Sequence, residues 1–487
     1  MPDAPTVSRP IDLVEPVVPA PTGSEKAPGG LGAAAVPVVP AGRTEAERPS
    51  RRSGLLLGDR RRALDAGRPV GFRATPRADD PAGEHWTDES EAHALVVAPT
   101  GAGKTTWLAC QLAEHPGSAV VVDPKGELAA MTARRRLELG NDVVVLDPFG
   151  VTEAFDVRLF RGRFDPGHWL AHSSAIEDEA MALAAELHAA PLARDPFWAA
   201  SATDLSAALI SHVYEDLPHD RSWSKVADLH FAGDFDMNVA KLLDAGAVTN
   251  ATAIESLVAY LSHPERDTRP SVLSTARAGM RAFHTPTVKR VTSGTSFDPA
   301  GMVSGEQPVT LYLVLPPQNM VSHAPLVRLW LTALLRALTS PERAHRTPGP
   351  RSEALFLIDE LPALGRLAMV PSLFAYLRSF GVRAVAVVQS LAQLEVAYGP
   401  EARVIRENAG LRMAFGVSDL DQAEAVAPML GVDPDLLLGL GREEMVVRHP
   451  HGVSRCRRAT HLDAAFVPEG AFDPNPFHPV GRDGRPR

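Results

Sequence analysis

The chain has 487 residues, which is enough for two or three domains, and 45% of them are hydrophobic, which allows a sizeable core. Its formal net charge of −10 excludes a uniformly basic nucleic-acid-binding protein, so any contact with nucleic acid must come from a local patch or from an assembled ring. The 2 cysteines, Cys110 and Cys456, lie far apart in the sequence and offer no disulfide framework, which suits a reducing cytosol.

The N-terminal part of the chain has two different compositions. Residues 1–50 are rich in proline, alanine and glycine and show no helical or strand period, so we expect a disordered tail. Residues 51–77 carry many more arginines than aspartates. A charge run of this kind is usually a solvated face, and the alternative is a contact with nucleic acid or with anionic lipid headgroups.

The sequence predicts neither a membrane span nor a signal peptide. No apolar run approaches the ~18 residues that a membrane-spanning helix needs. Residues 1–14 contain charged side chains and prolines where a signal peptide would have its apolar core. We therefore expect a soluble, cytoplasmic chain without a transmembrane segment.

Residues 95–106, LVVAPTGAGKTT, have the order of strand, glycine-rich loop and helix that a phosphate-binding loop requires. The apolar run at residues 95–97 predicts a buried strand, and the pattern from Lys104 onward predicts a helix. Ala98 stands where the motif has its first glycine. The later glycines let backbone N–H groups approach a phosphate, and the helix N-terminus adds partial positive charge. The alternative interpretation is a glycine-rich turn before an ordinary helix.

The loop predicts a binding site for ATP and Mg²⁺. Lys104 would reach the β- and γ-phosphates, and the hydroxyl of Thr105 would ligate the metal. The expected nucleotide-binding residues are Pro99, Thr100, Gly101, Ala102, Gly103, Lys104, Thr105 and Thr106.

Two further buried strands are predicted after the loop, at residues 119–123 and 143–147, with a helical pattern between them. Strands that alternate with helices and end in polar residues are typical of a parallel sheet with its ligands at the carboxyl edge. From residue 165 to 290 the apolar spacing is helical throughout, which predicts an inserted all-α domain.

The alternation of strands and helices resumes after residue 300. A strand is predicted at residues 309–315, a helix at 327–338 and a strand at 354–358, which ends in Asp359 and Glu360. Asp359 would hold Mg²⁺, and Glu360 would polarise the attacking water. A strand that ends in two carboxylates is weak evidence alone, and it becomes strong when combined with Lys104 and Thr105.

A strand at residues 382–388 ends at Gln389, which could sense the γ-phosphate or orient the water; the alternative is a hydrogen-bonded strand cap. Further strands are predicted at residues 411–415 and 445–448, the latter at an edge of the sheet. The cluster of His449, His451, Cys456 and His461 fits no common zinc-ligand spacing and lies among arginines, so we interpret it as a basic surface turn.

With these motifs in place, the chain resembles the TraG/TraD-type conjugative coupling proteins of type IV secretion systems, which are hexameric P-loop ATPases related to the FtsK/HerA motors. The phosphate loop alone indicates only the superfamily, and the blocks that follow it in order are more specific. These blocks are APTGAGKTT (98–106), DPKGEL (123–128), LDPFG (146–150), DPFWAASATDLSAALI (195–210), LIDELPALGRL (357–367) and VVQSLAQLEVAYG (387–399).

The resemblance implies a RecA-like α/β domain with a central parallel sheet, interrupted by an all-α domain that helps to recognise relaxase-bound DNA or protein. It implies a homo-hexamer with a channel for single-stranded DNA, which works with type IV secretion channel components. It also implies that Arg378 reaches the neighbouring subunit's nucleotide, and it favours a catalytic role for Gln389. The implied catalytic set is Lys104, Glu360, Gln389 and Arg378.

The expected organisation has five parts: a tail at residues 1–50, the nucleotide-binding domain at 51–164 and 301–465, the all-α domain at 165–300, and a flexible tail at 466–487. Family members usually carry N-terminal transmembrane helices, and this sequence shows none. That difference predicts either a membrane-anchoring partner, which would recruit the chain to the inner face of the cell membrane, or a soluble motor.

The function implied by the resemblance is an ATP-hydrolysing motor that delivers single-stranded DNA, or a relaxase–DNA substrate, to a secretion channel. One alternative is a coupling ATPase that exports protein effectors without DNA. Another is a non-hydrolysing, nucleotide-gated docking platform, against which the intact Lys104, Asp359 and Glu360 argue.

Overall fold

The computed structural model describes residues 54–63, 84–188, 196–303, 307–339, 353–461, 463 and 465–477. These residues all belong to one compact unit, which spans residues 51–487. The predicted tail at residues 1–50, much of the arginine-rich segment and residues 478–487 lie outside the described residues.

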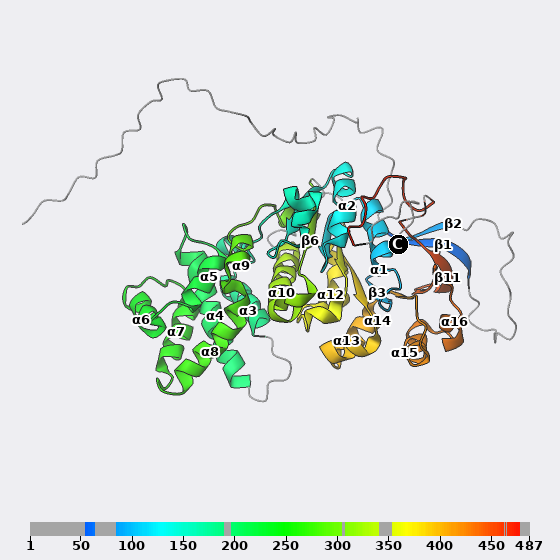
Figure 1. Cartoon of the computed structure of the whole chain (residues 1–487). Helices are drawn as coiled ribbons and strands as arrows, with labels where there is room; N and C mark the ends of the chain where they lie inside the picture. The colour runs from blue at the N-terminus through cyan, green and yellow to red at the C-terminus, as the bar shows by residue number, and fades with distance from the viewer. Residues whose placement is uncertain are drawn as a thin grey trace, which may run out of the picture. The chain divides into compact units, whose positions relative to one another are not determined.

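The described residues form an 11-stranded sheet in the order β2-β1-β11-β10-β9-β3-β8-β7-β4-β6-β5 (Figure 1). The seven strands from β9 to β5 are parallel to one another, and β10, β11, β1 and β2 extend this sheet by antiparallel pairing. The strands are β1 (Leu55–Ala63), β2 (Glu84–Asp88), β3 (Ala94–Val97), β4 (Ala119–Val122), β5 (Asp142–Leu146), β6 (Val309–Leu313), β7 (Ala354–Ile358), β8 (Val382–Val388), β9 (Leu411–Ala414), β10 (Glu444–His449) and β11 (Gly452–Arg458).

Both faces of the parallel part of the sheet are covered, because its strands are apolar on both sides. In β3, for example, Leu95 and Val97 lie in one core, and Ala94 and Val96 lie in the other. Apolar residues of α1 (Lys104–Glu114) and α2 (Glu127–Glu138) complete the second core. The first core is completed by α10 (Pro317–Thr339), α12 (Val370–Tyr376), α13 (Leu391–Tyr398), α14 (Glu401–Asn408), α15 (Leu420–Leu430) and α16 (Pro434–Leu438).

Helices alone fill the described chain between β5 and β6, apart from short 3-10 turns. Figure 1 shows α4 to α8 gathered in one group, and part of this group has its own core around Leu205, Leu209, Phe235 and Leu257. The insertion joins the rest of the fold through the first core, to which α3, α4 and α5 also contribute, and the Arg336 side chain of α10 donates to Glu179 of α3. The helices between β5 and β6 are α3 (Ile176–Leu187), α4 (Pro196–Asp216), α5 (Trp223–His230), α6 (Phe235–Asp244), α7 (Ala251–Ser262), α8 (Thr268–Met280) and α9 (Pro286–Val291).

The structure confirms an α/β fold with a mostly parallel sheet and a helical insertion. Every strand predicted from the sequence is present within one or two residues at each end. The strands β1, β2 and β11 were not predicted, because β2 and β11 are mostly polar and β1 continues its three leucines with a glycine, an aspartate and three arginines.

Two expectations about the C-terminal part are wrong. The strand at residues 445–448 is not at an edge, since β10 pairs with β9 on one side and with β11 on the other. The interpretation as a basic surface turn is wrong for Cys456, which is buried in β11 together with Arg458, whereas His451 does lie in the exposed turn between β10 and β11. The alternating residues of β11 explain the error, because every second side chain of this arginine-rich strand faces the core.

None of the helices in the described residues is long and apolar enough to cross a membrane.

Candidate functional site

A glycine-rich loop leaves the carboxyl end of β3 and leads directly into α1. Strand β3 lies between β8 and β9, and all its residues are buried. Gly101 and Gly103 have φ angles of 79° and 87°, in the left-handed region that glycine adopts without steric cost. At Gly103 a Cβ atom would also lie 2.8 Å from the guanidinium of Arg458. A side chain at residue 103 would therefore strain the backbone and would displace this guanidinium.

Lys104 begins α1, and its side chain folds back over the loop. The Nζ atom donates to the carbonyl oxygen of Ala98 at 3.3 Å. It also lies 3.7 Å from the Oε2 atom of Glu360, and both side chains are largely buried. The first turn of α1 also holds Thr105 and Thr106, directly after this lysine. The structure thus brings the predicted lysine and the predicted catalytic carboxylate together.

The two adjacent carboxylates follow β7, as the sequence predicted, and their environments differ. The Oδ1 atom of Asp359 is buried and has no hydrogen-bond partner among the described residues. Burial raises the pKa of Asp359 to about 6, and the charge of Lys104 opposes that rise. Glu360 adopts a left-handed φ of 66°, which is strained for a residue with a side chain.

The residues present fit a divalent cation of the kind that prefers oxygen ligands. Burying a carboxylate oxygen without a hydrogen-bond partner destabilises the folded state, because the oxygen loses its hydration. A bound cation would offset that cost. Asp359 supplies such an oxygen, and Thr105 supplies a hydroxyl in the first turn of α1. These two residues could hold Mg²⁺.

Gln389 links the loop to the catalytic carboxylate. Its Oε1 atom accepts a hydrogen bond from the Thr100 hydroxyl at 3.0 Å, and its Nε2 atom donates to Oε2 of Glu360 at 2.5 Å. Its backbone oxygen accepts from Nε2 of Gln422 at 2.6 Å. Since the ends of β3, β8 and β7 are neighbours in the sheet, one amide side chain spans all three. This placement goes beyond a simple strand cap.

Asp123 lies after β4, next to the two carboxylates of β7, and was not among the predicted site residues. Its Oδ2 atom accepts from the backbone N–H of Ala129 at 2.8 Å. Burial raises its pKa to about 7, and the charges of Asp359 and Glu127 contribute to that rise. The signal for it was in the sequence, because Asp123 ends a predicted strand at the same sheet edge.

Arg378 lies near the amino ends of the parallel strands, whereas the glycine-rich loop lies at their carboxyl ends. It belongs to a short 3-10 helix, η8 (Leu377–Phe380), which precedes β8, whereas Gln389 follows β8. The 7 residues of β8 separate the two edges by roughly 20 Å at about 3.3 Å per residue. The side chain is 59% exposed, and its Nε atom lies 3.9 Å from Oε2 of Glu91. Arg378 therefore cannot reach the loop of its own chain.

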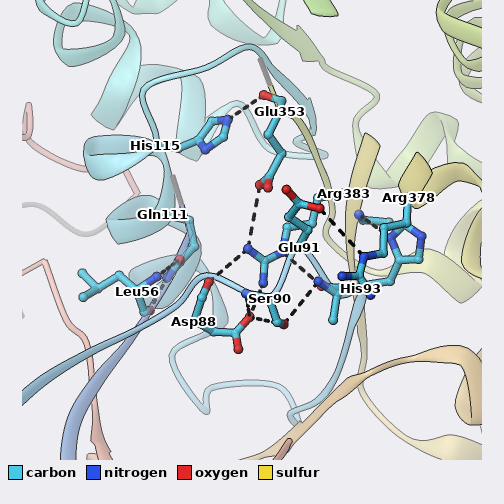
Figure 2. A network of polar contacts seen from close by, with 12 residues as sticks. Leu56, Asp88, Ser90, Glu91, His93, Gln111, His115, Glu353, Arg378 and Arg383 are labelled. Carbon is cyan, nitrogen blue, oxygen red and sulfur yellow. Dashed lines mark hydrogen bonds and ion pairs between the residues drawn. The ribbon is translucent and has the colours of Figure 1, made fainter. Parts of the chain in front are cut away.

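Figure 2 shows the network of polar contacts around Arg383, which lies near Arg378. The buried guanidinium of Arg383, in β8, donates to Oδ2 of Asp88 at 2.6 Å and to the carbonyl oxygen of Ala92 at 3.0 Å. His93 accepts from the backbone N–H of Ala384, and burial, with the nearby arginine charges, lowers its pKa to about 4. These contacts fix the loop between β2 and β3, which carries Glu91, against the start of β8.

Comparisons with known proteins match most of this chain. The family model described as "Type IV secretory system Conjugative DNA transfer" matches residues 53–432. The conjugal transfer protein TraG of Agrobacterium fabrum is 25% identical over 397 residues, which cover 78% of this chain and 58% of that protein. Protein VirD4 of the same organism is 26% identical over 366 residues, which cover 72% of this chain and 51% of that protein. The chain thus spans little more than half the length of these relatives.

Solved structures show the same fold. The bacterial conjugative coupling protein TrwBdeltaN70, in its unbound form, superposes with a TM-score of 0.59 at 17% identity, covering 77% of this chain and 88% of that chain. The plasmid coupling protein TrwB in complex with ADP and Mg²⁺ superposes with a TM-score of 0.58 at 16% identity, covering 78% and 88%. The α/β sheet with its helical insertion is therefore shared with these proteins.

Proposed function

We infer, since this chain belongs to the type IV secretory system conjugative DNA transfer family, that it is an ATP-hydrolysing coupling protein that delivers single-stranded DNA to a secretion channel. The observation that carries the ATPase part is the connected set of Lys104, Glu360, Gln389 and Thr100 at the carboxyl ends of three neighbouring parallel strands. In sheets of this kind the ligand site lies at that edge. The TrwB complex with ADP and Mg²⁺ supports the same ligands for this chain.

Each residue of the set has a role that follows from its chemistry. The backbone N–H groups of residues 101–104 and the Lys104 amine would bind the phosphates, and the helix N-terminus would add partial positive charge. Mg²⁺, held by Asp359 and Thr105, would supply charge neutralisation at the β- and γ-phosphates. Glu360 would orient and polarise the attacking water, and Gln389 would link that carboxylate to the loop.

The ring assembly is part of the same proposal. Arg378 is exposed at the edge of the sheet that faces away from its own loop. A cation in that position can stabilise γ-phosphoryl charge only in a neighbouring subunit. We therefore propose a homo-oligomer, a hexamer by resemblance to the family, in which each site is completed by the next subunit. Its partners would be a relaxase and the channel components, on the cytoplasmic side of the membrane.

Glu360→Gln should separate binding from hydrolysis. The amide keeps the size and one oxygen of the side chain but cannot accept a proton, so kcat should fall by about a hundredfold while ATP affinity stays near that of the unaltered protein. Steady-state ATPase assays and nucleotide titrations measure the two quantities. Glu395→Gln is the matched control, because Glu395 is an exposed residue of α13 that pairs with Arg406. Full turnover by the Glu360 variant would remove this residue from the mechanism.

The DNA part of the proposal is tested by stimulation and by salt. Single-stranded DNA should raise the ATPase rate, and the logarithm of its binding constant should fall linearly with the logarithm of salt concentration, by roughly one unit of slope per phosphate contact. A binding constant for single-stranded DNA that does not change with salt concentration would contradict the proposal that the chain is a DNA motor. Stimulation by a secreted protein, without any effect of DNA, would favour the export of protein effectors instead.

A further inference from the structure

Arg458 reaches the glycine-rich loop from the far end of the sequence. It is the last residue of β11, and only 6% of its surface is exposed. Its Nη1 atom donates to the carbonyl oxygens of Ala102 and Gly103, at 2.7 Å and 2.8 Å. The residue lies beyond position 432, where the match to the family model ends. It was not among the site residues predicted from the sequence.

These two carbonyl groups belong to the peptide units that matter most for phosphate binding. The carbonyl of Ala102 shares a peptide unit with the N–H of Gly103, and the carbonyl of Gly103 shares one with the N–H of Lys104. In a phosphate loop such N–H groups point toward the phosphate oxygens. A cation that hydrogen-bonds to the carbonyl oxygens polarises both units and strengthens their N–H groups as donors.

Other contacts hold the guanidinium in this position. Its Cζ atom lies 4.4 Å from the ring centroid of Phe415, which directly follows β9. The backbone N–H of Arg458 donates to the carbonyl oxygen of Glu443, the residue directly before β10. Burial lowers its pKa to about 10, so the side chain remains charged at neutral pH. A Cβ atom at residue 103 would lie 2.8 Å from this guanidinium, so glycine is what permits the approach.

We propose that Arg458 is a positioning residue for nucleotide binding, which orients and polarises the two loop peptides that receive the phosphates without touching the nucleotide itself. This inference rests on the proposed function, because it requires the loop to bind a nucleotide. It makes the C-terminal hairpin of β10 and β11 part of the nucleotide site.

The test compares Arg458→Gln and Arg458→Lys in the full chain, by titration with ADP and with ATP and by thermal unfolding. Arg458→Gln should weaken binding of both nucleotides by about tenfold or more, since two charge-assisted hydrogen bonds are lost. Arg458→Lys keeps the charge but lacks the planar fork, so it should restore part of the affinity. If the glutamine variant does not fold, the lysine variant alone tests the inference. Its nucleotide affinity should then lie below that of the unaltered chain.

Arg457→Gln is the matched control. Arg457 is the neighbouring residue of β11, and its guanidinium lies 2.7 Å from Asp59 and 2.8 Å from Asp463 without contacting the loop. This variant should lower thermal stability and leave nucleotide affinity unchanged. The inference is overturned if both Arg458 variants bind nucleotide normally, or if Arg457→Gln weakens binding equally. Failure of the unaltered chain to bind nucleotide would instead contradict the proposed function.

Discussion

Lys104→Ala should reduce ATP turnover by about a thousandfold, because it removes the cation nearest to the charge that develops during phosphoryl transfer. In the structure this amine bridges Ala98 and Glu360, so the substitution also leaves the Glu360 carboxylate without its neighbouring cation. Nucleotide affinity should fall as well, since the lysine would bind the phosphates in the ground state. An ATPase assay with a parallel nucleotide titration measures both effects.

The control for this variant is Lys225→Ala. Lys225 lies in α5 of the helical insertion and forms a surface pair with Asp220 at 3.1 Å, an interaction that contributes little to stability. This variant should hydrolyse ATP at the rate of the unaltered protein. Retention of near-normal turnover by Lys104→Ala would contradict the assignment of the phosphate loop.

Arg378→Ala should also lower turnover by about a thousandfold, which is the smaller end of the range for an arginine supplied by a neighbour. Unlike the lysine variant, it should bind nucleotide normally, because Arg378 lies at the opposite edge of the sheet from its own loop. The decisive experiment mixes Arg378→Ala subunits with Lys104→Ala subunits. In mixed rings, an intact loop of the first variant can lie beside an intact Arg378 of the second, so activity should return.

Arg403→Ala is the control for the mixing experiment, since Arg403 is exposed in α14 and pairs only locally, with Glu407 at 2.7 Å. It should be fully active alone. If mixing two inactive variants restores nothing although they form joint rings, then Arg378 does not act between subunits. Dissociation of the ring by Arg378→Ala, detected by light scattering, would indicate a role in assembly rather than in chemistry.

The sequence predicted most residues of the site but not the contacts between them. Short-range patterns predicted the loop after β3, the carboxylates after β7 and the glutamine after β8, because each depends on an apolar strand of four to seven residues followed by polar residues. The same reasoning gave no signal for Arg458. A run of arginines is compatible with an exposed turn as well as with a strand that buries alternate side chains.

The position of β10 shows why the order of the strands in the sheet could not be predicted from the sequence. Its pattern, apolar residues followed by Arg448 and His449, is compatible with an edge strand. Its real neighbour, β11, carries three arginines, and two of these have partners that only the folded chain supplies: Asp59 for Arg457 and the loop carbonyls for Arg458. A basic strand is buried here because the partners come from elsewhere in the sequence.

By itself, the sequence determined the α/β class, the phosphate loop, the paired carboxylates and the family resemblance, because these depend on residues that lie close together in the chain. The tertiary structure alone decided that Thr100 meets Gln389, that Gln389 meets Glu360, that Arg458 holds the loop and that Arg378 lies at the far edge. The physical reason is that contacts between residues as far apart as Ala102 and Arg458 depend on which strands become neighbours. That choice is made by the packing of the whole sheet rather than by any local pattern.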